Sequence, residues 1–350
     1  MREMKVAQSA KSAGHRRMLI CTEGFEPRSM EWLGRQDRQL AFDYSLILRN
    51  IPYRKENRYE DLLNIVGTLT RSGCLRPVDF SRYDPSVSER ELSAILTDKI
   101  SQIDCVVIDI SVMSKLLIVM LLVLLSDYTG TVRVIYSEPE DYAPSMGEYE
   151  KHKDEWGLFF PQPSFGVHSV VRTPRLSSVT MQGSPSLVVA FTSFNEQLIP
   201  ALVSECSPSR LIIVNGMPPH LTWRARATQE IAEALISEYR DDNPKDENGV
   251  LLRSVSTLDY RETFDMLSQV YRENAYSDKI ILAPTGSKMQ AVACGLFKIC
   301  CPDVHIEYPI PESFFVPGFS SQKTIQVHEI AFEYFSEEVR ELGTKFRLNG

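Results

Sequence analysis

The sequence predicts an α/β protein of two tandem Rossmann-like domains with mostly parallel sheets, related by internal duplication as a pseudo-dimer. Three observations predict this fold. Apolar segments alternate with amphipathic helical segments, a series of features recurs in the second half, and 350 residues exceed what one small core usually organises. The predicted strands are almost continuously apolar, as parallel strands covered by helices on both faces should be.

The two halves of the sequence share the order of their features rather than identical residues. Each half opens with a short apolar strand, 18–21 or 187–190, which runs into a polar loop. A second strand then ends at a proline, and later a Ser-Lys pair precedes a long apolar helix in each half. Because every feature recurs in the same order, we interpret the chain as two copies of one unit.

The domain organisation follows from this repeat. A glycine and a proline mark a linker between the copies, and helical spacing of apolar residues marks a terminal helix. We predict a flexible basic tail at 1–17, a first domain at 18–179, a linker at 180–186, a second domain at 187–330 and a C-terminal helix at 331–350.

Composition excludes several classes of protein. With 38 basic and 46 acidic residues the net charge is −8, which argues against gripping duplex nucleic acid but leaves room for a locally basic phosphate pocket. Seven cysteines without framework spacing indicate reduced thiols. The apolar run 116–125 is far shorter than the ~20 residues that span a bilayer, and no secretory signal precedes it. We therefore expect a soluble, cytoplasmic protein without a membrane partner.

Candidate ligand-binding residues gather where strands end. Ligands of doubly wound sheets bind at the carboxyl ends of strands, where helix N-termini favour phosphate. The first loops contribute Thr22, Glu23, Gly24, Phe25 and Arg28 in one half, and Thr192, Ser193 and Phe194 in the other. The loops after the fourth strands contribute Asp109, Ser111, Ser114 and Lys115, and then Pro284, Thr285, Gly286, Ser287 and Lys288.

These residue types allow both a structural and a functional interpretation. Ser114 and Ser287 taken alone are more simply helix N-caps. A lysine in the first turn opposes the helix dipole, so its recurrence as Lys115 and Lys288 favours a ligand role. Gly286 would allow close backbone approach.

Two arginines and the question of metals complete the set of candidates. Arg58 and Arg224 form either a basic rim or solvated helix entries. The histidines lack metal-ligand spacing and no nucleotide-cofactor motif occurs, so we predict neither a metal site nor a cofactor.

The segment 281–289, ILAPTGSKM, resembles the signature loop of CRISPR-associated Rossmann fold (CARF) domains. Segments 18–29 and 187–195 are similar to the first strand and ligand loop of that family, and 109–115 is similar to an Asp-Leu-Thr variant of its signature. The resemblance implies two tandem CARF-like domains that bind a cyclic oligonucleotide messenger, typically cyclic oligoadenylate, between them.

Carried over residue by residue, the resemblance implies first-loop contacts from Thr22 and Ser193 and signature-loop contacts from the two Ser-Lys pairs. The first half departs from the pattern, with Met113 opposite Gly286 and Asp109 opposite Leu282. A carboxylate on one side would repel phosphate unless it bonds a ribose hydroxyl, so we expect an asymmetric site or a degenerate first half.

Three functions remain open. The favoured one is a sensor of a cyclic oligonucleotide or related nucleotide in a prokaryotic antiviral defence or stress system, signalling to a separate effector. The alternatives are a metal-independent ring nuclease, with Lys115 or Lys288 stabilising developing charge, and a scaffold subunit with a vestigial pocket.

Overall fold

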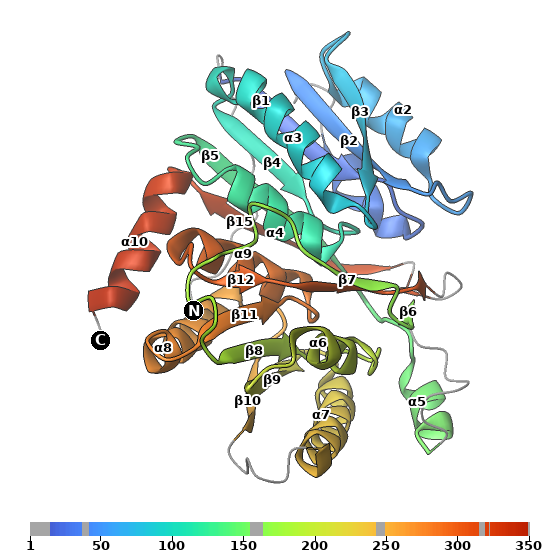
Figure 1. Ribbon diagram of the computed structural model, residues 1–350. Helices are drawn as coiled ribbons and strands as arrows, with labels where there is room; N and C mark the ends of the chain where they lie inside the picture. Colours follow the sequence, from blue (N-terminus) through green and yellow to red (C-terminus); the bar gives the residue numbers. More distant parts are fainter. Residues whose placement is uncertain are drawn as a thin grey trace.

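The computed structural model describes residues 15–36, 42–154, 164–242, 249–314, 319–321 and 323–348. Two mostly parallel sheets lie one above the other with helices between and around them (Figure 1). This arrangement confirms the predicted α/β class with Rossmann-like domains. Most of the expected N-terminal tail, residues 1–14, lies outside the described residues.

The first sheet has the order β15-β5-β4-β1-β2-β3. Strands β1 to β5 are parallel, and their buried faces carry the continuous apolar runs of the sequence. The bounds are β1 (Arg17–Thr22), β2 (Tyr44–Ile51), β3 (Leu75–Ser81), β4 (Cys105–Asp109) and β5 (Thr131–Pro139), with helices α1 (Glu31–Gly34), α2 (Tyr59–Leu69), α3 (Pro85–Lys99) and α4 (Lys115–Leu124) and short 3-10 turns η1 (Pro27–Ser29) and η2 (Ile100–Gln102).

The second sheet has the order β10-β9-β8-β11-β12, and all its strands are parallel. Taken from the β3 and β10 edges, the two sheets have the same strand order. The bounds are β8 (Ser186–Phe191), β9 (Arg210–Met217), β10 (Val250–Ser256), β11 (Lys279–Ala283) and β12 (His305–Ile306), with helices α6 (Leu198–Cys206), α7 (Thr222–Asp242), α8 (Tyr260–Asn274) and α9 (Lys288–Cys300).

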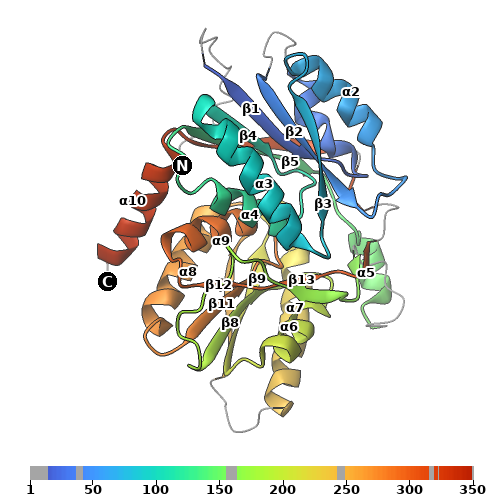
Figure 2. The ribbon, with the colours of Figure 1, turned by 45° about the horizontal axis from the view of Figure 1, so that its top comes forward.

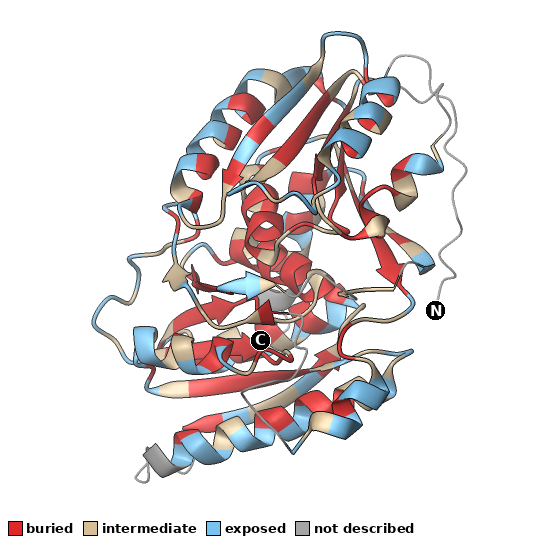
Figure 3. Ribbon diagram, turned by 90° about the vertical axis from the view of Figure 1, so that its right-hand side faces the viewer, coloured by how far each residue is buried: buried red, intermediate tan, exposed pale blue. Residues whose placement is uncertain are grey.

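Helices α4 and α9 pack against each other between the two sheets (Figures 1 and 2). Helix α4 is apolar on all faces and mostly buried, and buried ribbon, drawn red, fills the centre of the molecule in Figure 3. Gly295 of α9 allows close approach: an added Cβ would lie 2.8 Å from Leu122 Cδ1 and 3.4 Å from Val119 Cα. The core is therefore continuous from one sheet to the other.

The two halves exchange strands, which the predicted domain bounds did not anticipate. Strand β15 (Thr324–Phe332) pairs antiparallel with β5, although the bound at 330 placed most of it in the second domain. In return, β7 (Ser169–Val171) pairs with β13 (Tyr308–Ile310), and β6 (Ser164–Phe165) pairs with β14 (Ser313–Phe314). The bounds at 179 and 330 therefore do not separate two self-contained sheets, because antiparallel partners lie far apart in the sequence.

Two outer helices also bridge the halves. Helix α5 (Met146–His152) follows the first sheet but packs on the second half, where Tyr149 Oη donates to Glu230 Oε2 at 2.8 Å. At the start of helix α10 (Phe335–Leu348) the backbone N–H of Phe335 donates to the Gly130 carbonyl of the first half. Further along the helix, the Val339 carbonyl accepts from the Cys300 thiol of the second half. Among the described residues, no helix has both the length and the apolar character needed to span a bilayer.

Replacing Gly295 by valine should separate α4 from α9 and lower the free energy of unfolding by about 1–3 kcal/mol. Gly67→Val is the matched control, because a Cβ at Gly67 meets nothing within 4 Å. The control should gain a few tenths of a kcal/mol from helix propensity, roughly as expected for an exposed helix. Urea unfolding measures both variants, and equal stabilities would contradict the close helix contact.

Candidate functional site

A cavity of about 400 Å³ lies between the two halves. It is bordered by the loops that follow β1, β4, β8 and β11, the strands on either side of each sheet's switch point, where α/β sheets bind ligands. The predicted residues that line it are Glu23, Gly24, Phe25, Arg28, Ser114, Lys115, Thr192, Ser193, Phe194, Arg224, Gly286, Ser287 and Lys288.

The two signature lysines cross between the halves. Lys115 opens α4 and donates from Nζ to the carbonyl of Thr285, 2.9 Å away in the loop before α9. Lys288 opens α9 and donates to the carbonyl of Met113, 2.6 Å away in the loop before α4. Each half therefore holds, through one lysine, the loop that precedes the central helix of the other half.

Both lysine side chains are poorly solvated. Desolvation by the surrounding protein lowers the pKa of Lys115 to about 8 and that of Lys288 to about 7. The positive charges of Arg28 and Lys115 also lower the pKa of Lys288, while Glu26 and Asp109 raise it. The described residues provide no carboxylate within ion-pair distance of either Nζ, so an anion entering the cavity would find two cations held by carbonyl groups alone.

The remaining loop residues mostly shape the backbone. Ser114 and Ser287 are N-caps that accept from Leu117 and Gln290 backbone N–H groups, so the simpler interpretation of these serines holds. Gly286 has no room for a side chain, since an added Cβ would lie 2.7 Å from Phe191 Cβ. Its role in this state is close packing.

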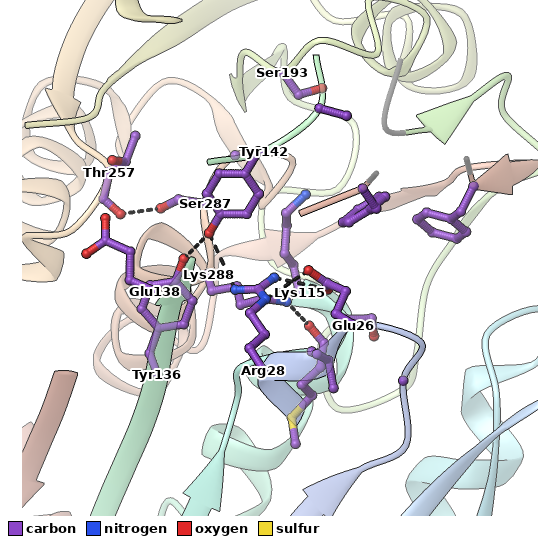
Figure 4. A pocket seen from close by; sticks show the side chains of 18 of the residues that line it. Glu26, Arg28, Lys115, Tyr136, Glu138, Tyr142, Ser193, Thr257, Ser287 and Lys288 are labelled. Carbon is purple, nitrogen blue, oxygen red and sulfur yellow. Dashed lines mark hydrogen bonds and ion pairs between the residues drawn. The ribbon is translucent and has the colours of Figure 1, made fainter. Parts of the chain in front are cut away.

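Arg28 forms the centre of the cavity wall (Figure 4). It is only 3% exposed and donates from Nε and Nη2 to the two carboxylate oxygens of Glu26, at 2.8 and 3.0 Å. Nη1 reaches the hydroxyl of Tyr142 at 3.4 Å, and Tyr142 bonds the hydroxyl of Tyr136. Glu26 and the two phenol groups raise the pKa of Arg28 despite its burial. The charge of this arginine is therefore already compensated.

Aromatic side chains from each half cover the first-loop phenylalanine of the other. Phe25 packs edge-to-face on Phe319 at 5.2 Å, and Phe194 packs on Tyr149 at 6.0 Å. Arg54 lies over the Phe314 ring, 5.5 Å from its centroid. The cavity therefore has apolar, aromatic walls near both ends.

The cavity is basic although the chain is acidic. Among the described residues its lining has six lysine and arginine side chains against three carboxylates, in a protein of net charge −8. The basic residues are Arg28, Arg54, Arg82, Lys115, Arg224 and Lys288, and the acidic ones are Glu23, Glu26 and Glu138. Local charge thus favours an anionic ligand.

Several predicted contact residues lie outside the lining. Asp109 is buried beneath it, where Oδ1 accepts from Ser111 N and Oγ and burial raises the carboxyl pKa to about 6. Thr22 donates to the Leu48 carbonyl, and Thr285 donates to that of Phe191. These side chains position the loops from below, and an approach to a ligand would require rearrangement. The predicted residues that lie outside the lining are Thr22, Asp109, Ser111, Pro284, Thr285 and the exposed Arg58.

The two arginines expected at the rim differ from each other. Arg58 is an exposed side chain that pairs with Asp61. Of the two interpretations that the sequence left open for it, this position matches the solvated helix entry. Arg224 instead clamps the halves together, donating to the carbonyls of Tyr142, Ala143 and Pro144 at 2.8–3.1 Å. Desolvation lowers its pKa to about 10. Arg224 does line the cavity, but its donors are engaged.

Sequence reasoning missed part of the lining. Tyr136 and Tyr308 both border the cavity, and each recurs in the segment that follows the central helix of its half, Tyr136 in β5 and Tyr308 in β13. That recurrence is the sequence signal that could have placed them in the site. Phe314, Phe319 and Ile325 had no such signal, because strand exchange brings them to the cavity. Among the described residues, His, Cys, Asp and Glu form no group that could hold a metal ion.

Comparison with known proteins gives remote likenesses only. No family model matches the chain. No curated protein sequence matches it either. A solved Type III CRISPR defence DNA nuclease activated by cyclic oligoadenylate is 13% identical over 83% of this chain, with a TM-score of 0.47. This chain spans 65% of the length of that nuclease, less than two thirds. The cytoplasmic domain of a prokaryotic cation chloride cotransporter is 10% identical over 86% of this chain and 98% of its own, with a TM-score of 0.24.

Replacing Arg224 by alanine should release the 142–144 loop and lower the free energy of unfolding by about 2 kcal/mol, because three carbonyls lose a charged donor. Arg226→Ala is the control, since that side chain is 85% exposed and forms a surface ion pair with Glu230. The control should change stability by less than about 0.5 kcal/mol. Urea unfolding with hydrogen exchange over 142–149 measures both, and equal exchange rates would contradict the clamp.

Proposed function

We propose that the chain binds a cyclic oligonucleotide second messenger in the cavity between its sheets and signals this to a separate effector of a prokaryotic defence or stress system. The observation that carries the proposal is the pair of crossed lysines. Lys115 and Lys288 are desolvated, border one cavity and are held by carbonyl groups only. Phosphodiester oxygens would give each ammonium group an anionic partner, which is a stronger interaction than a carbonyl provides.

The walls of the cavity support a nucleotide rather than a simple anion. Phe25, Phe194 and Phe314 place apolar aromatic surface near both ends. Bases stack on such rings, at roughly 1–3 kcal/mol per base. Cations at the centre and aromatic rings towards the ends fit a ligand whose phosphates are internal and whose bases point outward.

The position of the cavity supports a sensor. A ligand that draws the lysines towards its phosphates would compete with the bonds that hold the two ligand loops together. Such a ligand has different contacts in the two states of those loops, which is the requirement for shifting a conformational equilibrium. The exchanged strand β15 and helix α10 connect this region to the surface.

The first test is thermal shift against cyclic di-, tri-, tetra- and hexanucleotides. A ligand that binds only the folded state raises the melting temperature of the wild type by mass action. The Lys115→Met/Lys288→Met variant should lose that shift. Lys298→Met is a matched control, because Lys298 is also buried and donates to backbone carbonyls but lies outside the cavity. A ligand shift that survives in the double variant would contradict the proposed site.

Product analysis of each ligand that binds separates the remaining functions. An unchanged ligand supports the sensor, a linearised ligand supports the ring nuclease, and no shift with any ring favours the scaffold.

Affinity for such a ligand should fall as pH rises. The free-state pKa values of about 7 and about 8 mean that both lysines lose their protons between about pH 6.5 and pH 9. A bound phosphate raises both pKa values, so binding takes up protons in this range and weakens by roughly tenfold or more across it. Calorimetry in buffers of different ionisation enthalpy measures the proton uptake. Uptake of no proton near pH 8 would contradict this mechanism.

A further inference from the structure

The two ends of the cavity are chemically unequal. Glu23 and Thr192 occupy equivalent backbone positions, since each N–H donates to the second strand of its sheet, to Leu48 at 3.0 Å and to Val214 at 2.9 Å. Both residues line the cavity. One end therefore has a carboxylate where the other has a hydroxyl.

The Glu23 carboxylate is held in place by neutral donors. Oε1 accepts from the backbone N–H of Asn50 and from Nδ2 of Asn57, both at 2.9 Å. The residue is only 3% exposed, and no hydrogen bond from the described residues reaches Oε2. Arg49 and Asp79 act on it from a distance with opposite signs, and burial raises its pKa. One carboxylate oxygen is thus immobilised while the other is available.

The corresponding hydroxyl is internally satisfied. Thr192 Oγ1 donates to Asn215 Oδ1 at 3.0 Å, which also accepts from Thr228 at 2.7 Å. The other two carboxylates of the lining already have charged or imidazole partners, Glu26 with Arg28 and Glu138 with His328. Glu23 is therefore the lining carboxylate whose hydrogen bonds come from amides alone.

A carboxylate in a cavity that receives phosphates opposes binding unless a ligand donor uses it. Phosphate oxygens cannot donate, whereas the exocyclic amino group of a base can, and carboxylates accept such amino groups in base recognition. We propose that Glu23 Oε2 accepts a hydrogen bond from the exocyclic amino group of the base bound at the first-half end. The Thr192 end makes no equivalent bond, so the two ends of a cyclic oligonucleotide are held unequally. This inference rests on the proposed function.

The test is calorimetric titration with cyclic di-, tri-, tetra- and hexa-adenylate and with the same rings in which purine, lacking the amino group, replaces adenine. Glu23→Gln keeps an oxygen for Asn50 and Asn57 but removes the charge. Glu89→Gln is the matched control, since Glu89 is equally buried and accepts from Arg175 N and Thr173 but lies outside the cavity.

The sign of the change decides between two roles for Glu23. If Glu23 accepts the amino group, Glu23→Gln lowers the affinity for the adenylate ring about tenfold or more and does not lower the affinity for the purine ring. Glu89→Gln then leaves both affinities unchanged. If Glu23 only repels phosphate, Glu23→Gln binds the adenylate ring as tightly as the wild type or more tightly, and the inference is overturned. Equal weakening of both rings, or by both variants, overturns it as well. Failure of the wild type to bind any of these rings overturns the inference, and failure to bind any ring of the wider thermal-shift panel contradicts the proposed function itself.

Discussion

The contact between α4 and α9 is the constraint on which the rest of the molecule depends. These helices carry the apolar surface that each sheet must bury, and they bury it against each other. Because both begin at the switch points of their sheets, their packing brings the loops that precede them to one cavity. The crossed lysines are a consequence, since the N-terminus of each helix lies beside the loop that precedes the other.

Strand exchange makes this arrangement one unit rather than two domains in contact. β15 completes the first sheet from the C-terminal end of the chain, while β7 extends the second half from the middle. Tyr149 of helix α5 and Phe319 each cover the first-loop phenylalanine of the other half. The cavity between the sheets therefore has walls from both halves at each end.

The charged side chains of the cavity differ in how far neighbouring groups already neutralise or bind them. Arg28 and Arg224 have engaged donors and contribute to architecture, whereas the two lysines, within the part of the chain that the structure describes, donate to backbone carbonyls and have no carboxylate partner. The acidic members of the lining all come from the first half. The two halves share one strand order but present different charges to the cavity. The sequence placed this asymmetry at Asp109, which lies beneath the lining.

Local pattern was enough to determine the class of fold, the loops that meet at the cavity and the Ser-Lys pairs at the helix starts, because alternating apolar strands and helices place switch-point loops at one edge. Only the tertiary structure decided that the lysines cross, that Arg224 binds carbonyls and that Phe314 and Phe319 reach the other half. Periodicity records which face of a segment is buried, but not which distant segment buries it. Contacts between residues far apart in the chain depend on packing and strand exchange, which no local pattern encodes.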